Sequence, residues 1–241
     1  MTRPFIVAIL LSLVGATASG AFAQEIKPDG VLVFGATGQL GSDIVKRLVA
    51  KGETVTVFVR PNSDRARLAG LKVSITEGDA MNGAAVAAAT TAARPRVTIN
   101  AIGRRGNQWG FWDTTQINIT AAAQTAGVKE LIFVSSIGVG DSAGAYTPEA
   151  RERTKVAHAE RFIAEENVKA SGLAYSILRI GGISWYGEPA TGQATLTEDR
   201  SVFGYVKYAD LAQLTVDCIG NPACQGKTWA AIDPTLKPDQ R

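Results

Sequence analysis

The sequence predicts an α/β fold in which a doubly wound parallel sheet carries helices on both faces. Strand-like apolar runs alternate with helical patterns along the chain from residue 29 onward, and such alternation produces parallel sheets with right-handed crossovers. The first run, at 31–34, is continuously apolar, as expected of a strand that is buried on both faces. The 241 residues, 46% hydrophobic and 20% charged, suffice for one well-packed domain.

In the first half of the chain, each expected strand is followed by a helical pattern. Leu40, Ile44 and Leu48 share one face of the first helix, as the helical period requires, and Pro61 ends the β-branched second strand. We expect strands at 31–34, 54–59, 72–76 and 96–101, and helices at 39–51, 63–69 and 82–93.

The second half continues the same alternation, with no internal repeat and no linker. Gly127 is a typical helix stop, and Thr147 followed by Pro148 is typical of a helix start. We expect helices at 113–126, 147–170 and 210–219, and strands at 130–134, 174–179 and 228–232. Ligands of such sheets bind at the carboxyl ends of the strands, where the strand order reverses.

Residues 1–23 have the features of a cleavable signal peptide. Arg3 precedes an apolar run at 5–15, which is too short to span a membrane, and Ala21-Phe22-Ala23 forms a small-residue cleavage site. An uncleaved anchor or a buried N-terminal helix is the alternative. The sequence therefore predicts a secreted or periplasmic protein that is mature from Gln24.

The composition excludes several classes of function. A formal net charge of +3 without long basic runs gives no surface for nucleic acid. One histidine and two cysteines cannot supply the four ligands of a usual zinc site, so we expect no metal. A Ser-His-Asp hydrolase would need His158 as its base. In an exported protein, Cys218 and Cys224 are expected to form a structural disulfide, with two unpaired thiols as the alternative.

The loop after the first strand predicts dinucleotide binding. Its glycines follow the spacing G-x-x-G-x-x-G between a strand and a helix, which allows a tight turn and places the helix N-terminus against a pyrophosphate. The expected cofactor contacts in this loop are Gly35, Thr37, Gly38, Gln39, Leu40 and Gly41. Further contacts are expected after later strands, at Ala101, Ile102, Gly103, Ser135 and Gly181.

Two charged residues bear on which dinucleotide binds. Arg60 ends the second strand, where an acidic residue would favour NAD and an arginine favours the 2′-phosphate of NADP. We therefore expect NADP, with NAD as the alternative. Asp79 follows the third strand and either binds the adenine amino group or caps the next helix.

These motifs resemble the atypical short-chain dehydrogenase/reductase superfamily, and in particular its NmrA-like NAD(P)-binding branch. The resemblance rests on the glycine loop at 35–41, Arg60, Gly78-Asp79, and the segments 133–138, 171–182 and 208–212, which occur in family order. It implies a Rossmann fold, NAD(P) binding and a substrate site over the nicotinamide. We therefore expect residues 24–241 to form one NAD(P)-binding domain whose C-terminal elements contribute to the substrate site.

The resemblance also implies roles for four residues. Asn118 matches an asparagine that supports a proton-relay water, Ser136 a serine that binds a substrate carbonyl, and Lys155 a lysine that holds the nicotinamide ribose. The catalytic tyrosine of the family would lie four residues before Lys155, where this chain has Arg151. Arginine is a poor proton donor but can stabilise a developing oxyanion.

Other side chains have competing interpretations. Tyr146 or Tyr186 could replace the missing acid, although both are typical packing aromatics. The loop 103–112 contains Arg104 and Arg105 with three aromatic residues, which either receive a flat, anionic or quinone-like substrate or only anchor the loop. His158 is expected to pack or face solvent, and the adjacent acidic pair 165–166 is expected to be a solvated face.

The leading hypothesis is an exported oxidoreductase that transfers a hydride between NADP and a small carbonyl, flavin or quinone-like acceptor. An NAD(P)-binding protein without turnover is the first alternative, favoured by Arg151. An isomerase or lyase on the same fold is the second. The expected partner is a small molecule, aromatic or anionic in character, and the sequence sets no oligomeric state.

Export gives the first testable prediction. The protein purified from its native compartment should begin at Gln24, because Ala21-Phe22-Ala23 directs cleavage after residue 23. N-terminal sequencing measures this, and a native protein that begins at Met1 or Thr2 would contradict it.

Overall fold

The computed structural model describes residues 29–103, 109–184 and 187–237. The predicted signal peptide, Arg104, Arg105 and Tyr186 lie outside these residues. The strands are β1 Val31–Phe34, β2 Val55–Val59, β3 Ser74–Glu77, β4 Val97–Asn100, β5 Glu130–Ser136, β6 Ala174–Ile180, β7 Gly182–Ser184, β8 Thr195–Thr197, β9 Tyr205–Lys207 and β10 Lys227–Ile232. The α-helices are α1 Gln39–Ala50, α2 Gly83–Ala93, α3 Phe111–Thr125, α4 Pro148–Lys169 and α5 Tyr208–Asp217, with 3-10 turns η1 Ala66–Leu68 and η2 Gly140–Ala145.

The predicted doubly wound α/β fold is confirmed. The main sheet has the strand order β3-β2-β1-β4-β5-β6-β10-β8, with only β8 antiparallel to its neighbour among the described strands. The order therefore reverses between β1 and β4, where a doubly wound sheet binds its ligand. The other predicted elements agree with the structure to within a few residues at their ends, but the expected helix at 63–69 is only the 3-10 turn η1. The short strands β7, β8 and β9 and the turn η2 were not predicted.

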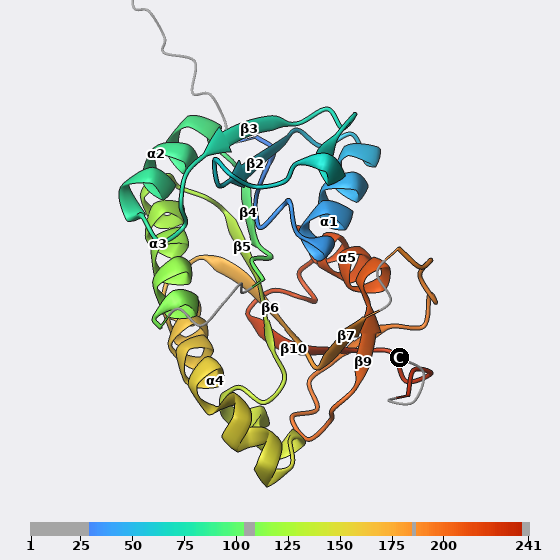
Figure 1. Ribbon diagram of the computed structural model, residues 1–241. Helices are drawn as coiled ribbons and strands as arrows, with labels where there is room; N and C mark the ends of the chain where they lie inside the picture. Colours follow the sequence, from blue (N-terminus) through green and yellow to red (C-terminus); the bar gives the residue numbers. More distant parts are fainter. Residues whose placement is uncertain (1–28, 104–108, 185–186, 238–241) are drawn as a thin grey trace, which may run out of the picture.

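Helices cover both faces of the sheet, with α2, α3 and α4 on one side and α1 and α5 on the other (Figure 1). The alternation of side chains along β1 produces this division, because Val31 and Val33 pack toward α1 and α5 whereas Leu32 and Phe34 pack toward α2, α3 and α4. All four of these side chains are buried. The continuously apolar strand of the sequence is thus buried on both faces.

A buried ion pair joins α4 to β6. Arg179 is 2% exposed and Glu165 is fully buried, and the guanidinium donates two hydrogen bonds, of 3.0 and 2.6 Å, to the carboxylate. The Ser135 hydroxyl donates a third, of 2.6 Å, and Arg179 also pairs with Asp141. Burial alone would lower the pKa of Arg179, but these carboxylates outweigh it and raise that pKa. The expectation of a solvated acidic pair is therefore wrong for Glu165 and holds only for Glu166, which is exposed.

The predicted disulfide joins the end of α5 to the segment that precedes β10. Cys218 and Cys224 are bonded, with their Cα atoms 5.4 Å apart, and both are buried against the α1 and α5 side of the sheet. Among the described residues, no helix combines the length and the apolar character that a membrane span requires.

Candidate functional site

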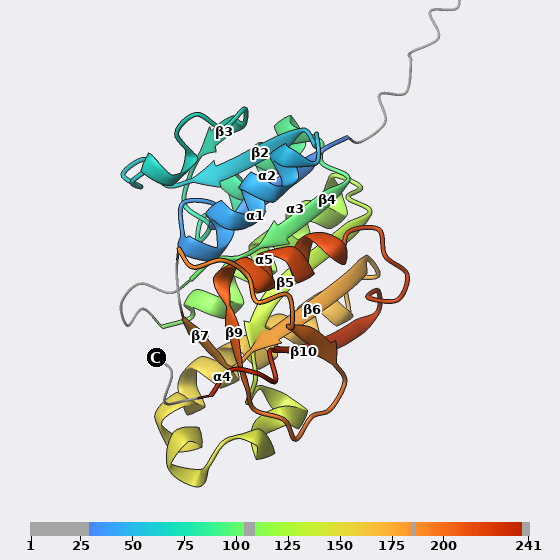
Figure 2. The same cartoon turned by 90° about the vertical axis from the view of Figure 1, so that its right-hand side faces the viewer.

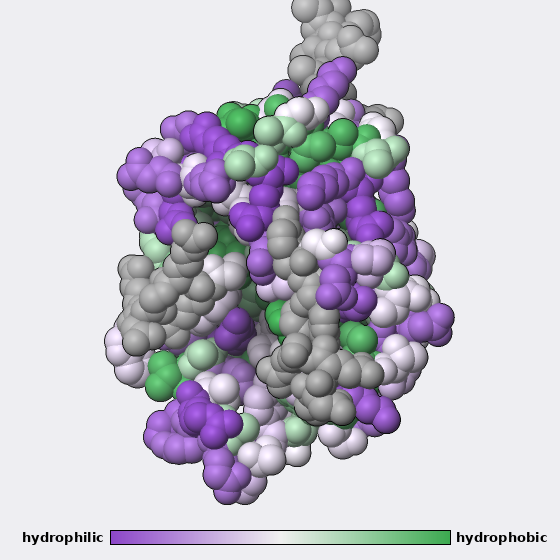
Figure 3. All heavy atoms as spheres, turned by 45° about the vertical axis from the view of Figure 1, so that its right-hand side comes forward, coloured by the Kyte–Doolittle hydropathy of each residue, from purple (hydrophilic) through white to green (hydrophobic). Residues whose placement is uncertain are grey.

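A cleft of about 640 Å³ opens at the carboxyl ends of the strands, where the sheet order reverses. Figure 2 shows α1 and α5 next to each other on one face of the sheet, and Figure 3 shows a recess in the middle of one face with hydrophobic residues at its floor. The cleft brings together many of the expected cofactor contacts, namely Gly35, Thr37, Gly38, Gln39, Leu40, Arg60, Asp79, Ala101, Ile102, Gly103 and Ser135.

Two glycines allow close backbone contacts of the loop after β1, one with the segment after β4 and one within the loop itself. Gly35 has φ +79°, and a Cβ added there would lie 2.5 Å from the carbonyl oxygen of Ala101. A Cβ added at Gly41 would collide with the backbone of Gly35. Gly41 does not line the cleft itself but permits the tight turn. The turn places the N-terminus of α1 at the cleft, where its backbone N–H groups can bind a pyrophosphate.

The adenosine end of the cleft lies beyond β2 and β3. Arg60 lines it, together with Arg67 from η1. Asp79 also lines it and accepts a 2.9 Å hydrogen bond from the backbone N–H of Met81. The cap of α2 is Asn82, which accepts from Ala85 N–H at 3.1 Å. The interpretation of Asp79 as the helix cap is therefore wrong, because the capping position falls three residues later.

At the opposite end, the loop after β4 and the end of β5 face Ile180, Ile183 and Tyr208. Gly181 does not line the cleft. It packs against the backbone of Gly204, where a Cβ would collide. Ser135 lines the cleft, but its hydroxyl donates its proton to the Glu165 carboxylate.

A cluster of three polar side chains lies just beyond this end, formed by Ser136, Tyr146 and His158. The Nε2 atom of His158 lies 3.4 Å from the Ser136 hydroxyl, and the Tyr146 hydroxyl is hydrogen-bonded with Ser136. The Tyr146 and His158 rings pack edge to face with centroids 5.3 Å apart. Gly138, with φ +96°, makes room for both rings, since a Cβ there would lie 2.5 Å from His158 and 2.8 Å from Tyr146.

The cluster is uncharged at neutral pH. Burial, together with the positive charges of Arg161 and Arg179, lowers the pKa of His158 to about 4, and burial raises the pKa of Tyr146. Thr154 lies 3.2 Å from Nδ1 and donates its own proton to the Ala150 carbonyl. The Ser136 hydroxyl likewise donates its proton to a carbonyl, that of Ile137 at 3.0 Å, so both hydroxyls can accept from the imidazole N–H.

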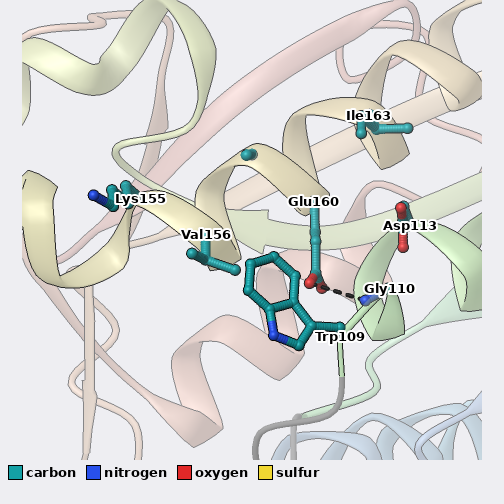
Figure 4. A pocket seen from close by; sticks show the side chains of 8 residues that line it. Trp109, Gly110, Asp113, Lys155, Val156, Glu160 and Ile163 are labelled. Atoms are coloured by element: carbon teal, nitrogen blue, oxygen red, sulfur yellow. Dashed lines mark hydrogen bonds between the residues drawn. The ribbon is translucent and has the colours of Figure 1, made fainter.

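Arg151 and Lys155 do not reach this cluster, which corrects two of the expected roles. Both lie on the exposed surface of α4, and Lys155 pairs with Glu152 at 63% side-chain exposure. Lys155 contributes instead to a second cavity of about 660 Å³ between α4 and the start of α3. Figure 4 shows its amine turned away from the Trp109 indole in that cavity. With about 100° between successive residues of a helix, Lys155 is rotated away from the inward face that carries Thr154 and His158.

Asn118 also has a different role from the one expected. Its amide donates a 2.9 Å hydrogen bond to the carbonyl of Ala80 and lies against Gly83. It therefore fastens the loop after β3, which lines the cleft, and does not contact Lys155 or the cluster.

Trp112, one of the three aromatic residues expected in the loop 103–112, lines the cleft, and Arg161 lines it without having been predicted. The sequence holds one signal for Arg161, because Thr154, His158, Arg161 and Glu165 recur at spacings of four, three and four. Such a spacing places them on one face of a helix. The face is polar, and only the structure shows that it points inward.

The depressed pKa of His158 predicts pH-dependent stability. The unfolded imidazole takes up a proton near pH 6.5 and the folded one only near pH 4, so the unfolded state binds more protons and stability falls as pH drops through this window. Between pH 7 and pH 5, the wild type should lose about 1 kcal/mol more unfolding free energy than His158→Gln, after allowance for solvent screening. Urea unfolding at both pH values measures this, and equal losses would place His158 in solvent.

Comparison with known proteins agrees with this geometry. Residues 35–222 match the NAD(P)H-binding family. ChuY, an anaerobillin reductase from Escherichia coli O157:H7, is 30% identical with a TM-score of 0.76, over 86% of this chain and 98% of that one. A short-chain dehydrogenase/reductase from Veillonella parvula, solved in complex with NADP, shares the fold at 17% identity and a TM-score of 0.67, over 85% of this chain and 94% of that one.

One relative is longer than this chain. The photosystem II assembly factor Ycf39 of Synechocystis sp. is 24% identical over 220 residues, which make up 84% of this chain but 62% of that protein. The chain thus spans less than two thirds of its length. The family match shows an NAD(P)-binding domain, and the cleft lies where a doubly wound sheet binds its ligand. The chain belongs to the NAD(P)H-binding family.

Proposed function

We propose that the chain is an NADPH-dependent reductase of a small, conjugated acceptor of the flavin or quinone type. The observation that carries the proposal is the neutral cluster of Ser136, Tyr146 and His158 at the end of β5, beside the nicotinamide end of the cleft. The similarity to ChuY, an anaerobillin reductase, supports a reductase. Tyr146, which is hydrogen-bonded with Ser136, offers a hydroxyl that α4 lacks, and this weakens the main argument for a protein without turnover.

The cluster suits an acceptor that needs little acid assistance. Bound NADPH supplies a hydride. The hydroxyls of Ser136 and Tyr146 bind the acceptor oxygen or nitrogen, and Tyr146, whose pKa burial raises, donates the proton. The Ile137 carbonyl, which accepts from the Ser136 hydroxyl at 3.0 Å, and the neutral imidazole of His158 keep that hydroxyl oriented. Because burial raises the pKa of Tyr146 and no imidazolium is present at pH 7, the cluster is a weak acid, and a simple ketone, whose alkoxide product is strongly basic, is a poor substrate.

We further propose that NADP is preferred over NAD and that the protein acts after export. Arg60 and Arg67 at the adenosine end support the first point, because guanidinium groups bind phosphates in a bidentate manner. The Cys218–Cys224 disulfide supports the second, because disulfides persist in oxidising compartments. A chain exported unfolded would bind its cofactor after folding.

Turnover is tested with menadione, flavin mononucleotide, anaerobillin and cyclohexanone as acceptors. NADPH oxidation should proceed with at least one of the first three and at least about 10-fold more slowly with the ketone. Ser136→Ala and Tyr146→Phe should each lower kcat about 100-fold, within the range of general-acid effects. The matched control is Tyr175→Phe, whose hydroxyl binds the Gly226 carbonyl elsewhere on the surface. Tight NADP binding without turnover of any acceptor would refute the reductase.

Cofactor preference is tested by calorimetry. NADP should bind about 10- to 100-fold more tightly than NAD, as expected for a hydrogen bond to a charged group. Arg60→Ala should reduce this ratio while leaving NAD affinity nearly unchanged. Lys72→Ala removes an exposed cation that does not line the cleft and should change neither value. Equal affinities in the wild type would remove Arg60 from the site.

A further inference from the structure

Arg161 is a cation held inside the nucleotide cleft by aromatic stacking. It follows His158 by three residues on α4 and lines the cleft together with Ser135 and Trp112. The carbon of its guanidinium lies 3.7 Å from the centroid of a Trp112 ring, a distance typical of a strong cation–π contact. A stacked guanidinium keeps its planar fork of donors directed to the sides, where a ligand can accept from it.

The aromatic support beneath Arg161 is itself fixed. Trp112 is 4% exposed, and its backbone N–H donates a 3.2 Å hydrogen bond to Glu160, which also accepts from Gly110 N–H at 3.0 Å. Figure 4 shows this Glu160 carboxylate directed from α4 at the start of α3. Because Glu160 is buried as well, the start of α3 is fastened to the helix that carries Arg161. The guanidinium therefore has a defined position before any ligand binds.

The position of Arg161 identifies which part of the cofactor it meets. Arg60 marks the adenosine end, after β2, whereas Ser135 lies at the end of β5, on the other side of the switch point. A dinucleotide bound across the glycine loop with its 2′-phosphate at Arg60 extends its other half toward Ser135. That half offers ribose hydroxyl and phosphate oxygens as acceptors for a guanidinium.

We propose that Arg161 binds the nicotinamide mononucleotide half of the cofactor, in the role for which the sequence pointed to Lys155. The inference deepens the proposed function, since it names a positioning residue of the same site. Arg161 would then have two roles in the cleft. The charge of Arg161 adds to burial in keeping His158 neutral, while its donors orient the cofactor beside the cluster.

The test measures binding in the absence of an acceptor, so it gives a result even for a protein that shows no turnover. Calorimetry compares NADP⁺ with adenosine 2′,5′-bisphosphate, which lacks the nicotinamide half. Arg161→Met should weaken NADP⁺ binding about 10- to 100-fold, the range for hydrogen bonds from a charged donor, and leave bisphosphate binding within about two-fold. The control Arg153→Met removes an exposed arginine of the same helix and should change neither affinity.

Bisphosphate binding also reports whether each variant has folded. Arg161→Lys, which keeps the charge but loses the planar fork, should bind NADP⁺ with an affinity between those of the wild type and Arg161→Met. Unchanged NADP⁺ affinity in both Arg161 variants would overturn the proposal. A loss of equal size for NADP⁺ and the bisphosphate would overturn it too, because Arg161 would then act on the adenosine half or on the fold.

Discussion

The buried ion pair between Arg179 and Glu165 is the interaction on which the geometry of the site depends. It joins α4 to β6. Glu165 also accepts a hydrogen bond from the Ser135 hydroxyl at the end of β5, and Arg179 also pairs with Asp141 in η2. Each member of the polar cluster is attached to one of these elements: Ser136 follows Ser135, Tyr146 follows η2, and His158 lies two turns before Glu165. Removal of one partner from such a pair costs roughly 3–5 kcal/mol, because the other charge stays buried without compensation. The pair thus links the stability of the fold to the alignment of its reactive side chains.

The cleft and the cluster divide the chemistry between them. The glycine loop, Arg60 and Arg161 line the cleft and are the proposed contacts for a dinucleotide, and the hydroxyls of the cluster are the proposed contacts for an acceptor. Burial beside two guanidinium groups keeps the imidazole of His158 neutral, so its contribution is orientation of Ser136 and not proton donation. Under the proposed function, such a site selects acceptors by the basicity of their reduced form, although α4 has Arg151 where the resemblance implies a tyrosine.

Much of the fold could be predicted from the sequence, and the site only in part. The strand at 31–34, the glycine loop and the start of α4 carry strong local signals, because burial on both faces, a tight turn and a capping threonine each restrict residue choice. The phase of α4 carries no such signal, since its inward face is built from polar residues such as His158 and Glu165. Lys155 was therefore assigned to the cleft from the family resemblance, and Glu165 was expected in solvent. Tertiary pairing with Arg179, which no local pattern reveals, decides the position of Glu165.

The central claim is that the nicotinamide of the bound cofactor lies beside Ser136, Tyr146 and His158. A crystal structure of the protein with NADP⁺ tests it most directly. The account predicts a dinucleotide across the glycine loop, with its 2′-phosphate at Arg60, Arg161 on the nicotinamide nucleotide, and the nicotinamide ring facing Ser136. A nicotinamide ring that lies instead in the second cavity, near Trp109 and Lys155, would contradict it.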